Sequence, residues 1–138
     1  MKVIFRYKLK KQFEFILIMA VKKELKMYDF SKTTKKEIRR LAALAHEREL
    51  EKALADLNLK FKQWKKEELD SFELDHQIHI FHNKISREIF KKYNSYDMKD
   101  HFIAIAIVNG IIDKEEVDPE AYQELKSLIE RINDSDYF

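Results

Sequence analysis

Apolar residues recur every three or four positions through most of the chain, which is the spacing of one face of an α-helix. The clearest run has steps of 4, 3, 4 and 3 and consists of Leu50, Leu54, Leu57, Phe61 and Trp64. This run, the long-helix row, predicts one apolar stripe on a helix over about 35–66 that faces another helix. Thr34 and Glu37 have capping-box spacing, which predicts the start of that helix.

A second stripe predicts a helix over about 71–93. Its apolar residues are Leu74, Ile78, Phe81, Ile85 and Ile89. Asp70 and Glu73 repeat the capping pattern at its start, so the chain should break between 66 and 71. The polar residues 94–96 indicate the next break.

The segment from Met98 to Asn109 contains Phe102–Val108, a run that is apolar on all sides, which is typical of a buried element. Its Ile and Val residues also suit a core strand. Asp97 before the run and Gly110 after it match a helix cap at each end and favour a helix. Asp118 and Pro119 then begin a last helix over 119–132, and residues 133–138 should fray.

These elements predict an all-α, elongated protein with one long helix, a medium helix and a small C-terminal helical cluster. One Gly and one Pro in 138 residues argue against a sandwich, a barrel or a doubly wound sheet. We expect residues 34–138 to form a single helical domain, preceded by a basic and apolar tail over 1–33. A chain this short cannot cover such long stripes alone, so self-association is expected.

The tail holds most of the positive charge. Residues 1–26 contain eight Lys or Arg and two Glu, a local charge of +6, so the other residues carry −4. The apolar run Phe15–Val21 follows Glu14 and is far shorter than a membrane span, which needs ~20 apolar residues. The tail could be a translated leader before a true start at Met19 or Met27, a basic amphipathic anchor, or an ordinary extra helix or strand.

Composition argues against an enzyme. The single glycine excludes a glycine-rich phosphate loop and a nucleophile elbow. The absence of cysteine excludes thiolate metal sites and cysteine nucleophiles. We therefore expect no catalytic residues, no cofactor and no small-molecule substrate, and a cytoplasmic location because nothing indicates export.

One alternative is a metal-binding protein or a metal-dependent enzyme. Asp75, His79 and His82 would share one helix face, and a carboxylate with two imidazoles can bind zinc. Asp75 could also orient His79 as a general base. These histidines could equally border an interface, and no fourth ligand is evident.

Another alternative is a nucleic-acid binder. Lys60, Lys62, Lys65 and Lys66 surround Phe61 and Trp64, as in some single-strand binding surfaces. The two aromatic residues fit the long-helix row better. We therefore expect neither a nucleic-acid partner nor a membrane partner.

Several segments together resemble the fluorescence recovery protein family of cyanobacteria and its relatives outside that group. They are His46–Leu50, Ile78–Phe81, Glu88–Ile89, Lys92–Asn94 and Asn109–Val117. The resemblance covers about 34–118 and needs one gap before Gly110. It implies an antiparallel homodimer through the long helix and a regulatory, non-enzymatic role. The family's founding member binds a photoactivated carotenoid protein and speeds its return to the resting state.

The resemblance also implies a protein-binding surface near the middle of the second helix. The matching region of this chain contains His76, His79, Ile80, Phe81, Ser86 and Arg87. His79 and Phe81 match the family's His and Phe. His76 replaces a Trp, Ile80 an Asp and Ser86 an Arg, with Arg87 adjacent. The resemblance therefore supports the helical scaffold better than it supports the binding surface. We expect an unidentified protein partner rather than a carotenoid-binding one.

Overall fold

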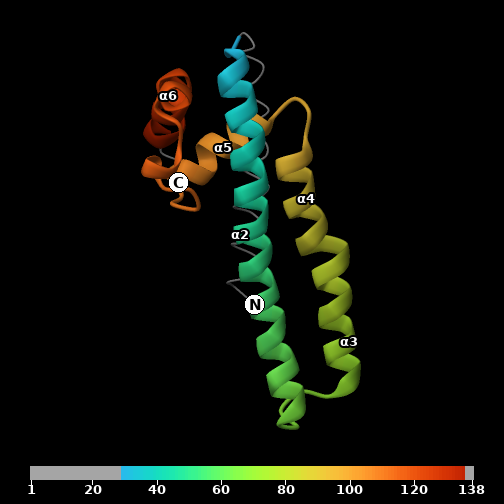
Figure 1. Cartoon of the computed structure of the whole chain (residues 1–138). Coiled ribbons are helices and arrows are strands. Elements are labelled where there is room, and N and C mark those ends of the chain that lie inside the picture. Colours follow the sequence, from blue (N-terminus) through green and yellow to red (C-terminus); the bar gives the residue numbers. More distant parts are fainter. Residues whose placement is uncertain (1–28, 136–138) are drawn as a thin grey trace.

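The computed structural model describes residues 29–135, which fold into helices with no strand among them (Figure 1). In chain order the elements are α2 (Lys32–Lys65), α3 (Ser71–Ile80), the π-helix η1 (Phe81–Ser86), α4 (Arg87–Asn94), α5 (Lys99–Val108), the 3-10 helix η2 (Lys114–Glu116) and α6 (Pro119–Asp134). The all-α prediction is confirmed, and so is the long helix. No helix of this described part is long and apolar enough to cross a membrane.

The helices make an elongated hairpin with a compact head at one end (Figure 1). The long helix α2 forms one arm, and α3, η1 and α4 return along it as the other. The short helices α5 and α6 pack on each other and on the first half of α2. Among residues 29–135, the distal half of the hairpin therefore has one helix on each side of its interface.

The start of α2 differs from the prediction. Ser31, not Thr34, is the N-cap, because its hydroxyl oxygen accepts a hydrogen bond from the Thr34 amide at 3.2 Å. The Ser31 amide donates to the Glu124 carboxylate at 2.9 Å, which ties this end of α2 to α6. The predicted capping partner Glu37 instead binds Arg40 and the Asp118 amide. Since α2 begins at Lys32, the predicted tail boundary at 33 falls inside the helix.

The second arm is not one α-helix over 71–93, as the spacing predicted. Its start is confirmed, because the Asp70 side chain accepts from the Glu73 amide at 2.8 Å. The π-helix η1 then interrupts it. At about 100° per residue, an unbroken α-helix would turn Tyr93 roughly 100° away from Leu74. The wider π turn absorbs one residue, so Leu74 and Tyr93, both buried, can face α2 together.

The buried run becomes helix α5, as its flanking residues predicted. Its end is a Schellman motif: the Gly110 amide donates to the Ile107 carbonyl at 3.1 Å, and the Ile111 amide donates to the Ala106 carbonyl at 2.9 Å. Gly110 has φ +74, which favours glycine. The N-cap position belongs to Met98 rather than to the predicted Asp97, and no side-chain hydrogen bond caps it.

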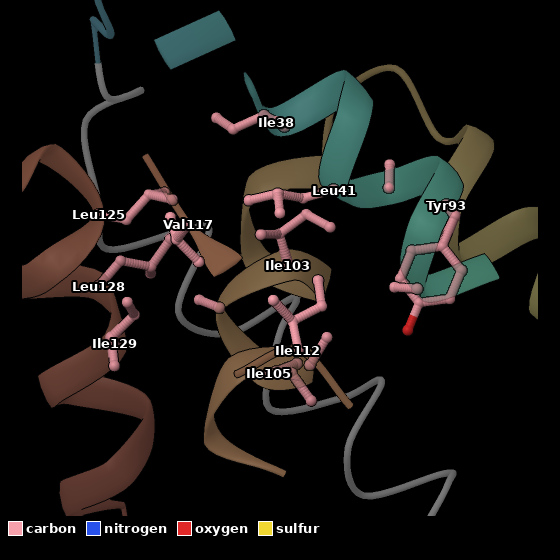
Figure 2. Packing of buried hydrophobic residues seen from close by; sticks show 14 of the residues in the cluster. Ile38, Leu41, Tyr93, Ile103, Ile105, Ile112, Val117, Leu125, Leu128 and Ile129 are labelled. Carbon is pink, nitrogen blue, oxygen red and sulfur yellow. The ribbon is translucent and has the colours of Figure 1, made fainter. Parts of the chain in front are cut away.

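The core lies where α5 is enclosed by the head end of the hairpin and by α6 (Figure 2). Its fully buried side chains include Leu41, Ile103, Ile112, Leu125 and Leu128. Because α5 is surrounded on several sides, its sequence needs no polar face.

The last helix begins as predicted, with Asp118 accepting from the Ala121 amide at 3.1 Å and a proline in the first turn. It extends to Asp134, so Asn133 and Asp134 are helical rather than frayed. The rest of the predicted frayed end, residues 136–138, lies outside the described residues, as do the predicted features of 1–26.

Candidate interaction surface

The long-helix row lies on the distal half of α2 and is only partly covered. Leu54 is 47% exposed, Phe61 36% and Trp64 39%, while Leu50 and Leu57 are half-buried. The arm formed by α3 and η1 packs along this part of α2. Part of the row therefore packs in the hairpin interface, and part of it faces solvent.

The returning arm contributes to the same partly open surface. Ile78 and Ile85, from the predicted second stripe, are 37% and 36% exposed, whereas Leu74 and Ile89 are buried. Leu74 and Ile78 belong to the same α-helix, which ends before η1, so the π-helix does not account for their different exposure. Large apolar side chains are thus exposed on both arms of the hairpin.

The predicted partner-binding residues occupy consecutive turns of α3, η1 and the start of α4 but do not form one uniform patch. His76, His79 and Arg87 are exposed. Ile80, Phe81 and Ser86 are half-buried. The first three can meet a partner directly, and the others set the shape of the helix beneath them.

The predicted metal face is only partly assembled. His79 Nε2 lies 3.5 Å from Asp75 Oδ2, an exposed pair at one-turn spacing. His82 lies in the π-helix, so the even α-helical spacing that would align it with this pair is interrupted. Within residues 29–135, no group of three or more His, Asp or Glu side chains is placed to hold a metal ion.

The predicted basic patch at the end of α2 stands beside acidic residues. Lys62, Lys65 and Lys66 are exposed, and so are Glu67 and Glu68 directly after them. Trp64 is held at this end of the hairpin, because its indole Nε1 donates to the Ser71 hydroxyl at 3.0 Å. The hairpin tip is therefore mixed in charge.

An ion pair that the sequence analysis missed fixes the head to the long helix. Arg48 donates from both terminal nitrogens to the Glu116 carboxylate, at 2.6 and 2.5 Å, and also to the Ile111 carbonyl at 2.8 Å. The same carboxylate accepts from the Asp113 amide at 3.0 Å. The Arg48 hydrogen bonds and this amide lower the pKa of Glu116 to about 2.

A second contact strengthens the same junction. Arg40 donates to the Glu37 carboxylate and to the Glu116 carbonyl, the latter at 2.7 Å. Hydrogen bonding from Arg40 is the main reason that the pKa of Glu37 is lowered. The pattern Asp113-x-x-Glu116 was a visible capping box, but no local signal linked it to arginines more than sixty residues earlier.

A third missed contact joins the two arms near the head. His46 stacks on Tyr93 with ring centroids 6.2 Å apart and meets the edge of Phe90 at 6.1 Å. Lys92 Nζ lies 3.2 Å from a Glu49 oxygen in the same region. The arms are thus tied firmly near the head, whereas apolar residues remain open toward the tip.

Comparison with known proteins adds no relative: no family model matches this sequence, and neither the curated proteins nor the solved structures include a significant match.

Proposed function

We propose that this chain is a non-enzymatic, cytoplasmic interaction module that pairs with a second copy through the long-helix row and regulates another protein. The observation that supports the proposal is the partial exposure of Leu54, Phe61 and Trp64 in one row on the distal half of α2. Contiguous apolar surface of this kind commonly marks a protein-binding face. The resemblance to the fluorescence recovery protein family supports the same role.

An antiparallel arrangement suits the row because its residues are placed nearly evenly about Leu57: Leu50 and Trp64 are each seven residues away, and Leu54 and Phe61 are three and four residues away. With Leu57 at a two-fold axis, Leu50 of one copy lies opposite Trp64 of the other, and Leu54 lies opposite Phe61. Such a self-complementary contact is the usual form of a homodimer. Two hairpins would then give each distal helix the additional neighbours that it lacks in one chain.

The test is the mass of the full chain in solution, measured by light scattering over a range of concentrations. Leu54→Asp should shift the equilibrium to monomer, because each dimer would bury two carboxylates among apolar side chains. Leu59→Asp is the matched control: Leu59 is 55% exposed, but at about 100° per residue it lies roughly opposite the row. Equal masses for the two variants, or a monomeric parent chain at every concentration, would refute the dimer.

The regulated protein would bind the exposed part of the second arm. We assign this role to His76, His79 and Arg87, with Ile80, Phe81 and Ser86 shaping the surface. Once a partner is purified, alanine at the three exposed positions should weaken its binding without changing the mass of the dimer. Binding that survives the triple change would refute this assignment.

A further inference from the structure

We propose that residues 1–28 cover the long-helix row of their own chain and so compete with the second copy. This inference rests on the proposed function, because it concerns the regulation of the same surface. Three properties of the chain support it: the reach of the segment, the length of its apolar run and the order of its charges.

The reach is set by where the segment joins α2. Ser31 is fixed at the head end, since its amide bonds to Glu124 on α6. From there Leu50 and Trp64 lie roughly 29 and 50 Å along the helix, at about 1.5 Å per residue. An extended chain covers about 3.3 Å per residue, which places Val21 and Phe15 within roughly 33 and 53 Å of Ser31. The apolar run can therefore reach the row when the connecting residues are fully extended, and its extended length is close to that of the row.

The chemistry of the two surfaces also matches. The run Phe15–Val21 contains no charged residue, and three side chains of the row, Leu54, Phe61 and Trp64, are between a third and a half exposed. Burying apolar surface stabilises by about 25 cal/mol per Å², and an internal segment loses no translational freedom when it binds. A tethered run can therefore compete with a separate molecule for the row.

The charges fall in complementary order. Residues 2–11 contain five Lys or Arg and no acid. Residues 67–75, at the hairpin tip, contain five acids and no Lys or Arg, and all five acids are exposed. If Phe15–Val21 follows α2 from the head toward the tip, residues 2–11 extend past the tip and turn back along α3 to meet these acids. Lys65 and Lys66 directly precede the acidic run. The basic residues of 2–11 should therefore favour the acids on α3, which are farther from these two lysines.

A disulfide test suits this chain because it has no cysteine of its own. Phe61 is roughly 45 Å from Ser31 along α2, and a fully extended chain would let Leu17 reach up to roughly 46 Å from Ser31. The pair Leu17→Cys with Phe61→Cys is placed in the full chain and oxidised at a concentration where the parent chain is monomeric. The control pair is Leu17→Cys with Gln123→Cys, since Gln123 is exposed on α6 within the same tether length.

The expected result is an internal disulfide that forms at least about tenfold faster in the test pair than in the control. A flexible tether of 14 residues has an r.m.s. length of roughly 20 Å, so without docking it favours Gln123 beside the anchor over Phe61 at its full reach, and an excess for the test pair reports docking. About 0.5 M salt should slow the test pair, because it screens the charges at the tip. Equal rates would overturn the proposal. Disulfides formed only between chains would overturn it too, because the second copy would then occupy the row.

Two further measurements complete the test. Leu17→Asp should tighten the dimer by about tenfold, corresponding to about 1.4 kcal/mol, because the competing segment is removed. Binding to anionic vesicles that Leu17→Asp abolishes, without an internal disulfide, would identify a membrane anchor and overturn the proposal. An internal disulfide with no dimer would refute the proposed function alone, and a dimer without the disulfide would refute this inference alone.

Discussion

The π-helix gives the sharpest test of how the second arm is built. Deletion of Asn83, an exposed residue within η1, should let the arm continue as an unbroken α-helix. At about 100° per residue, this deletion keeps Leu74, Phe81, Ile89 and Tyr93 within roughly 40° of one another. The shortened arm therefore presents the same buried side chains to α2 that the native arm presents.

The control is deletion of Lys91, another exposed residue of the same arm. This deletion turns Tyr93 by about 100° relative to the preceding part of the arm, so Tyr93 no longer faces α2 in line with Leu74. Tyr93 is only 3% exposed, and removing a buried aromatic side chain from its site typically costs about 3–5 kcal/mol. Deleting Asn83 instead restores regular hydrogen bonding in place of the π turn, which is worth about 0.5–1.5 kcal/mol for one bond.

Urea unfolding followed by circular dichroism measures the difference. With a slope of about 1–3 kcal/mol per M, a gap of at least about 3 kcal/mol separates the two midpoints by roughly 1 M or more. The Asn83 deletion should unfold at or above the midpoint of the parent chain, and the Lys91 deletion well below it. If the Asn83 deletion is as damaging as the Lys91 deletion, the account of the π-helix is wrong.

Two further predictions concern titration and metal binding. The pKa of Glu116 is about 2 in the folded chain against an ordinary 4.5, so its contribution to stability is complete above pH 4.5 and is lost as the pH falls toward 2. Glu116→Gln should flatten this part of the pH dependence of the urea midpoint; an unchanged slope contradicts the Arg48 contact. Zinc added to chelator-treated, untagged protein should leave the melting temperature unchanged, and a rise that His79→Gln removes would restore the metal alternative.

The candidate surface was less predictable than the helices that form it. The long-helix row could be found from spacing alone, but spacing did not reveal how much of it the second arm covers. The π-helix η1 could not be found from spacing, because a spacing argument assumes α geometry throughout. The contacts of Arg48 with Glu116 and of His46 with Tyr93 join residues far apart in sequence, so no local pattern could identify them.

The sequence by itself determined the class of fold and most helix ends. Polar caps such as Asp70 and Asp118, the glycine after α5 and the three-to-four spacing act within a few residues, so they can be read directly. The Ser31 cap of α2 is also a local contact, with the Thr34 amide, but only the tertiary structure decided that Glu124 on another helix binds the Ser31 amide. It also decided which apolar side chains are buried, since burial depends on the helices that lie opposite and not on the stripe itself.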